Sequence, residues 1–130
     1  MKPSIGVLLY TYNRTDDARI NQEIIRNVWG KSELFDEIKI IHTYNGEEAW
    51  YPEQYLEDKL IRRENLGHFL GAEDLINTGM TAFQNEFPDV EYIIILAADT
   101  WCVKPNYIAS IIDNMRKDDF VNILLWYLMT

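Results

Sequence analysis

The sequence predicts an α/β fold in which helices cover both faces of a mainly parallel sheet, giving three layers. Two observations support this prediction. The apolar runs at 5–10 and 92–96 are continuous rather than alternating, which is typical of strands buried on both faces. Segments with apolar residues at helical spacing separate these runs along the chain. We expect one domain over residues 1–130.

The first half of the chain predicts a strand, a helix and a second strand. Ile5–Tyr10 is the expected first strand, and Ile38–His42 is the expected second one. Between them, Gly30 supplies a stop for a helix that begins near Thr15. The apolar residues at helical spacing, which we expect to form the buried face of this helix, are Ile20, Ile24, Ile25, Val28 and Trp29.

The second half continues the alternation. Residues 60–62 predict a short third strand, and 72–83 predict a helix with a clear apolar face. A buried strand is expected at 92–96, and Pro105 fits the first turn of a third helix. Residues 121–127 predict a last apolar strand. Its exposed edge favours homo-oligomerisation.

Composition and charge argue against several classes of function. The chain has 21 acidic and 12 basic residues, a formal charge of −9, which disfavours a nucleic-acid polymer as partner. Cys102 is the single cysteine, so neither an internal disulfide nor a multi-cysteine zinc site is expected. No apolar run approaches the roughly 20 residues that span a bilayer. We expect a cytoplasmic protein without a transmembrane segment.

Polar residues follow the expected strands at their carboxyl ends, where α/β sheets bind ligands. The candidates in these segments are Thr11, Tyr12, Asn13, Arg14, Asn45, Asn65, Gly67, His68 and Asp99. A carboxylate such as Asp99, directly after an apolar strand, requires an ionic partner, a solvated cleft or a bound cation. Structural alternatives stay open: Asn13 can cap the next helix, Asn45 can form a turn, and His68 can be an ordinary exposed histidine.

Taken in order, these segments resemble the nucleotide-sugar-binding half of family-two-like glycosyltransferases, which have the A-type, Rossmann-like fold. The matching segments cover nearly the whole chain: Thr11–Arg14, Thr43–Gly46, Asn65–Gly67, Asn77–Gly79 and Leu96–Thr100 with Pro105. The resemblance implies that the candidates above, together with Asn77, bind a nucleotide-diphosphate sugar, with a UDP-sugar as the expected donor. It implies transfer of the sugar to an acceptor that the sequence does not identify: a saccharide, a lipid or a protein.

The resemblance also implies a divalent cation, Mn²⁺ or Mg²⁺. The metal motif of the family is Asp-x-Asp, and Ala97 replaces its first acid, so Asp99 is the metal ligand that remains. The family takes its acceptor site and catalytic base from a C-terminal half that lies beyond the strand ending here at Thr130. We therefore expect the fold to lack that half, and no catalytic residue is assigned.

Two alternatives to a glycosyltransferase stay open. The first is a non-catalytic nucleotide-sugar-binding or interaction module, which the replacement of the first motif acid favours. The second is a sugar-phosphate nucleotidyltransferase on a related fold. That reaction needs a glycine-rich phosphate loop after the first strand, and residues 10–14 contain no glycine.

Overall fold

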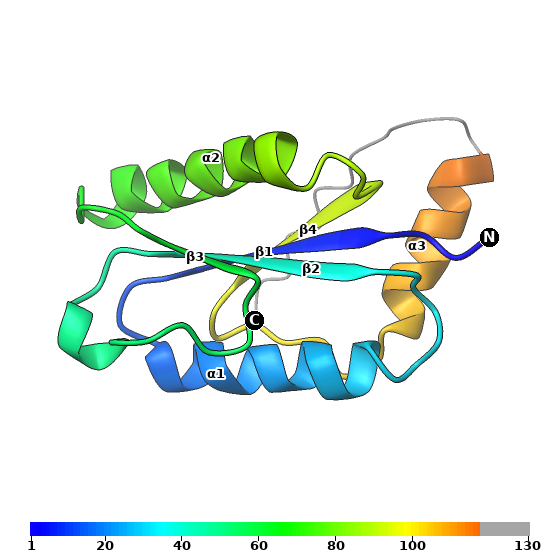
Figure 1. The fold of residues 1–130 in the computed structure, drawn as a ribbon, viewed down its shortest axis with the longest axis horizontal. Helices are drawn as coiled ribbons and strands as arrows, with labels where there is room; N and C mark the ends of the chain where they lie inside the picture. The colour runs from blue at the N-terminus through cyan, green and yellow to red at the C-terminus, as the bar shows by residue number, and fades with distance from the viewer. Residues whose placement is uncertain (118–130) are drawn as a thin grey trace.

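The protein, described here over residues 1–117 of a computed structural model, has a parallel sheet between two layers of helices (Figure 1). The strands are β1 Ile5–Thr11, β2 Ile38–Tyr44, β3 Lys59–Arg62 and β4 Tyr92–Ala97. Their order is β3-β2-β1-β4, and all three pairings are parallel. The predicted α/β class and parallel sheet are therefore confirmed. The strand expected at 121–127, with oligomerisation through it, lies outside the described residues.

Helices cover both faces of this sheet. They are α1 Thr15–Ile24, which continues as the π-helical segment η1 Ile25–Trp29, then α2 His68–Glu86 and α3 Asn106–Lys117, with a short 3-10 turn η2 at Glu48–Trp50. Figure 1 shows α1 and α2 on opposite faces of the sheet. Within residues 1–117, no helix combines the length and the apolar character required to cross a membrane.

The strands are apolar throughout because each face of the sheet has its own buried cluster. In β1, Ile5, Val7 and Leu9 pack with α1, η1 and α3, whereas Leu8 packs with α2 on the other face. Helix α2 lies very close to β1, since a Cβ added at Gly79 would be 2.5 Å from the Leu8 Cγ. Gly79 is therefore required for the packing of this helix on the sheet.

The buried face of α1 differs from the prediction. Ile20 and Val28 are exposed, and Asn21 and Gln22 are buried with Ile25. These two polar side chains have partners from distant segments: the Asn21 Nδ2 donates to the Thr100 carbonyl oxygen at 2.9 Å, and the Gln22 Nε2 donates to the Tyr51 hydroxyl at 2.9 Å. The amide nitrogens of both side chains therefore have acceptors, whereas the buried Asn21 Oδ1 has no hydrogen-bond partner.

The strand order creates a switch point beside β1. The chain passes from β1 to β2 and β3 on one side, and it adds β4 on the other side. The strand order therefore reverses between β1 and β4, and the helices that follow these two strands, α1 and α3, pack on the same face of the sheet. In open α/β sheets this is where a crevice forms.

Candidate functional site

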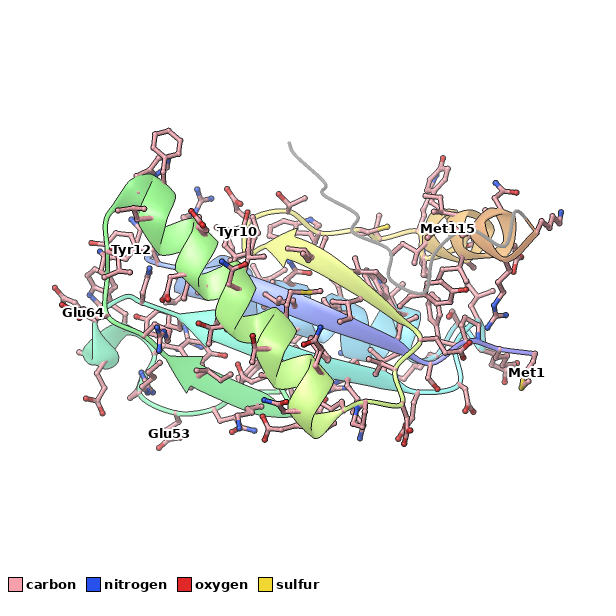
Figure 2. The ribbon with its side chains drawn as sticks, turned by 90° about the horizontal axis from the view of Figure 1, so that it is seen from above. Met1, Tyr10, Tyr12, Glu53, Glu64 and Met115 are labelled. Atoms are coloured by element: carbon pink, nitrogen blue, oxygen red, sulfur yellow. The ribbon has the colours of Figure 1, made fainter. Side chains whose placement is uncertain are left out.

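The carboxyl ends of the strands and the start of α2 enclose a pocket of about 390 Å³, which we call the carboxyl-edge pocket. This volume lies within the range of small-molecule sites, roughly 300–1,000 Å³. In the view of Figure 2, Tyr10 and Tyr12 flank the first turns of α2. The lining residues are Tyr10, Thr11, Tyr12, Asn13, Arg14, Asn45, Asn65, Gly67, His68, Ala72, Leu75, Ala97, Ala98 and Asp99.

The structure brings together all the predicted candidates except Asn77. Those in the pocket are Thr11, Tyr12, Asn13, Arg14, Asn45, Asn65, Gly67, His68 and Asp99. They come from segments far apart in the sequence and meet because parallel strands end at one edge. Asn77 is exposed on α2, outside the lining. It lies nine residues beyond the start of α2, roughly 13 Å along the helix axis.

The apolar part of the pocket was missed from the sequence. Tyr10, Ala72, Leu75 and Ala97 line it. Ala72 and Leu75 belong to the inner face of α2, so their period predicted only core packing. One signal could have indicated that Ala72 and Leu75 also line a pocket. Helix α2 begins beside the carboxyl ends of the strands, so the first turns of its inner face border the crevice there.

Two buried oxygen atoms in the pocket have no hydrogen-bond partner. The Thr11 and Asn45 side chains are buried, with 4% and 7% of each residue exposed, and both the Thr11 Oγ1 and the Asn45 Oδ1 are unpartnered. Buried polar atoms in proteins normally have partners, and an unsatisfied one costs about 1–3 kcal/mol. Three further buried polar atoms without a partner, the Asn21 Oδ1, His42 Nε2 and Thr43 Oγ1, lie outside the lining of the pocket.

Gly71 keeps space open next to Asn45. A Cβ at Gly71 would lie 3.0 Å from the Asn45 Nδ2 and 3.7 Å from the Asn65 Oδ1. Gly71 also closes the first turn of α2, since its N–H donates to the Gly67 carbonyl oxygen at 2.8 Å. The carboxamides of Asn45 and Asn65 therefore both lie beside the first turn of α2.

The start of α2 supplies a second polar wall. Gly67 precedes the helix with a φ of 96°, a left-handed conformation that glycine adopts without strain, and no side chain caps the helix. The Gly67 N–H donates to the Asn65 Oδ1 at 2.9 Å. Uncapped N–H groups in a first helical turn carry partial positive charge. His68, the first residue of α2, lines the pocket beside them.

Arg14 and Asp99 form an ion pair across the mouth of the pocket. The Arg14 Nη1 lies 3.5 Å from the Asp99 Oδ2, and the Arg14 Nε donates to the Asp17 Oδ2 at 2.6 Å. The Arg14 and Asp99 side chains are 57% and 38% exposed, so both are accessible to a ligand. A carboxylate after an apolar strand was expected to have an ionic partner, a solvated cleft or a bound cation. Asp99 has the first two of these.

The described residues offer limited ligands for a metal. Within residues 1–117, no group of three or more His, Cys, Asp or Glu side chains is arranged to hold an ion. Among the described lining residues, Asp99 supplies the one carboxylate. Carboxylate oxygen suits Mg²⁺ and Mn²⁺, and Mg²⁺ is commonly bound by one or two carboxylates together with substrate phosphates. The donor set therefore fits a cation that arrives with a diphosphate, not one held by protein ligands alone.

An aromatic pair borders the pocket beside Tyr12. The rings of Tyr12 and Trp50 meet edge to face with centroids 5.8 Å apart. Trp50 belongs to η2, in the segment between β2 and β3. Trp50 therefore packs against a side chain of the pocket lining, and a movement of the segment between β2 and β3 would also move Tyr12.

A buried network holds the same segment against the sheet. The His42 Nδ1 lies 2.8 Å from the Glu57 Oε2, which also accepts a hydrogen bond of 2.7 Å from the Tyr51 hydroxyl. Burial lowers the pKa of His42, and the opposing effect of Glu57 does not restore it. Burial alone would raise the pKa of Glu57, but hydrogen bonds from His42 and Tyr51 outweigh it and lower that pKa.

The carboxyl-edge pocket thus combines unpartnered oxygens, an uncapped helix start, an ion pair and an apolar floor. Such a combination suits a polar ligand of small-molecule size that carries hydrogen-bonding groups and negative charge. Comparison of the chain with protein-family models, with curated proteins and with solved structures gave no significant match. The geometry of the pocket and the motifs that line it are therefore the basis for a functional proposal.

Proposed function

We propose that the protein binds a nucleotide-diphosphate sugar, with a UDP-sugar as the expected ligand, in the carboxyl-edge pocket, and that this is the donor site of a glycosyltransferase. One observation supports this proposal above the others. The candidate donor-site residues lie far apart in the sequence, and all of them except Asn77 line the same pocket. We further propose the A-type glycosyltransferase fold, with which a parallel sheet covered on both faces is compatible.

The proposed cation is Mn²⁺ or Mg²⁺, held by Asp99 together with oxygens of the diphosphate. When bound, such a cation stabilises the negative charge that grows on the departing nucleoside diphosphate. Arg14 and His68 lie in the same pocket and can donate to phosphate oxygens. The acceptor is a saccharide, lipid or protein that remains to be identified, and no catalytic base is proposed.

Donor binding is tested by calorimetric titration of the protein with UDP-glucose in the presence of Mn²⁺. Asn13 is an exposed lining residue, so Asn13→Ala should weaken binding by about threefold to tenfold, corresponding to one hydrogen bond of about 0.5–1.5 kcal/mol. The matched control is Asn85→Ala, which changes an exposed asparagine near the other end of α2. Absence of binding, or equal losses in the two variants, would contradict the proposal.

A non-catalytic binding module is the second candidate function. The observation that favours it is the state of Asp99, the one carboxylate among the described lining residues, which is already paired with Arg14. Release of UDP from UDP-glucose separates the two candidates. The donor site of an enzyme should slowly transfer glucose from UDP-glucose to water and so release UDP. A binding module should bind UDP-glucose and leave it intact.

A further inference from the structure

The first turn of α2 has three backbone N–H groups without an acceptor in the described part of the chain. Helix α2 begins at His68, and its first internal hydrogen bond is the one that the Gly71 N–H donates to the Gly67 carbonyl oxygen. The N–H groups of residues 68–70 precede that bond, and no acceptor for them is found within residues 1–117. The same turn contains no acidic residue. Its partial positive charge is therefore free to act on an anion from outside the chain.

A second observation indicates a ligand at the same place. Thr11 and Asn45 line the pocket, each is more than nine-tenths buried, and their side-chain oxygens have no partner. The Asn45 carboxamide lies beside the first turn of α2, because a Cβ at Gly71 would be 3.0 Å from the Asn45 Nδ2. His68 lines the same pocket. A ligand there would meet N–H donors on one wall and oxygen acceptors on another.

The charged residues around the start of α2 leave room for an anion. Asp74, in the second turn, accepts two hydrogen bonds from Arg63, at 2.9 Å and 2.8 Å, so its charge is compensated. Glu64 and Glu73 are exposed, where water and salt screen their charges. The ring of His68 adds a further hydrogen-bonding group at the first helical position.

We propose that the first turn of α2 is a phosphate site that works without a metal ion, and that its ligand is a phosphate ester with hydroxyl groups, such as a nucleotide. This inference rests on the proposed function, because it assigns one phosphate group of the same ligand. The N–H groups of residues 68–70 donate to the phosphate oxygens. Hydroxyl groups of the ligand donate to the Asn45 Oδ1 and form a hydrogen bond with the Thr11 hydroxyl. The cation proposed at Asp99 is not required for these contacts.

The contribution of the phosphate is measured by calorimetric titration with UMP and with uridine, in EDTA and again in Mn²⁺. UMP should bind roughly tenfold or more tightly than uridine, because hydrogen bonds to a charged group contribute more than neutral ones. The ratio of the two affinities in EDTA should equal the ratio in Mn²⁺. Circular dichroism and urea unfolding establish that each variant used below is folded.

Two substitutions of His68 separate the backbone from the side chain. Proline suits the first position of a helix and has no N–H, so His68→Pro removes one donor of the proposed site while the helix start is kept. His68→Ala removes only the imidazole ring and is the matched control. UMP should bind to His68→Pro roughly threefold to tenfold more weakly than to His68→Ala, the loss of one charged hydrogen bond. Uridine should bind equally to the two variants.

Thr11→Val tests the other wall of the pocket. It removes an oxygen that has no partner in the described chain, so the free energy of unfolding should stay the same or rise. The affinities of UMP and uridine should fall by the same factor, because the lost contact is to a hydroxyl group that both ligands carry. A purely structural defect would instead lower the stability of the protein.

Equal affinities of UMP and uridine would overturn the inference, and so would UMP binding that requires Mn²⁺ or that is equal in His68→Pro and His68→Ala. If UDP-glucose still binds in any of these cases, the proposed donor site stands without this phosphate site. If neither UMP nor UDP-glucose binds under any of these conditions, the proposed function fails, and the inference fails with it.

Discussion

At the scale of single residues, His42 and Glu57 are the buried titratable pair of the described chain. Both side chains are fully buried, and their contact of 2.8 Å holds the segment that carries Trp50. Burial, aided by the nearby charges of Arg19 and Arg62, keeps the pKa of His42 below its ordinary value of 6.5. The folded protein therefore resists protonation of His42, whereas the unfolded chain does not.

This difference predicts loss of stability in mild acid. As pH falls below about 6.5, the unfolded chain gains a proton on His42 that the folded chain excludes, so the free energy of unfolding should decrease. The slope approaches at most about 1.4 kcal/mol per pH unit, the limit for one proton. Urea unfolding between pH 7.5 and 5 measures it. His42→Gln should remove this slope, and His68→Gln, which changes an exposed histidine, should not. A slope that survives in His42→Gln would contradict the assignment.

Glu57 makes the free energy of unfolding depend on pH at lower pH values as well. Its pKa is held below 4.5 in the folded chain, so its contribution is present at neutral pH and disappears as pH falls through that region. Both groups therefore act in the same direction, and acid should loosen the segment between β2 and β3 at the rim of the pocket.

Residue partners across long sequence separations were beyond prediction from the sequence. The carboxylate of Asp99 was expected to be paired, solvated or bound to a cation, and the first two of these environments are found. That Arg14 is its partner follows from the adjacency of β1 and β4, which local patterns do not encode. The buried contact between His42 and Glu57 was not predicted either, because Glu57 lies in an irregular segment whose path back to β2 no periodic pattern indicates.

At the scale of elements, α1 determines the path of the chain after β4. The buried Asn21 Nδ2 donates to the carbonyl oxygens of Ala98 and Thr100, at 3.2 Å and 2.9 Å. Asp99 lies between these two residues. Helix α1 therefore positions the carboxylate of the pocket through one amide group.

Asn21→Leu should destabilise the protein by about 1–3 kcal/mol, because the two carbonyl oxygens lose their donor while they remain buried. It should also weaken UDP-glucose binding in the presence of Mn²⁺, since the turn that holds Asp99 loses its anchor. Urea unfolding and calorimetry measure the two effects. Asn27→Leu, an exposed position in η1, is the matched control and should change neither. Unchanged stability in Asn21→Leu would show that α1 does not anchor this turn.

The elements themselves were predictable to different degrees. Their order and type over residues 1–117 agree with the prediction, because continuous apolar runs and helical periods are strong local signals. The predicted inner face of the first helix was right at Ile25 and Trp29, which are buried, and wrong at Ile20 and Val28, which are exposed. An apolar period cannot identify a buried face made partly of asparagine and glutamine, whose partners come from other parts of the chain.

At the scale of the whole molecule, topology explains why the candidate residues meet. Every strand of the described sheet is parallel, so the segments after β1, β2, β3 and β4 reach the same edge (Figure 1). The convergence of Asn13, Asn45, Asn65 and Asp99 on one pocket was predictable from this rule alone. Asn77 was included by resemblance, and its place along α2 puts it outside the lining.

The location of a bound donor tests the account most directly. Two-dimensional amide NMR of the labelled protein, titrated with UDP-glucose and Mn²⁺, reports it residue by residue. We predict shifts concentrated at 11–14, 45, 65–68 and 97–99. No shifts are expected at Ile25, Arg26 and Gly30, which together with residues 35–38 line a second, smaller groove beside the start of β2. Shifts centred on that groove, or no shifts at all, would contradict a donor site at the carboxyl edge of the sheet.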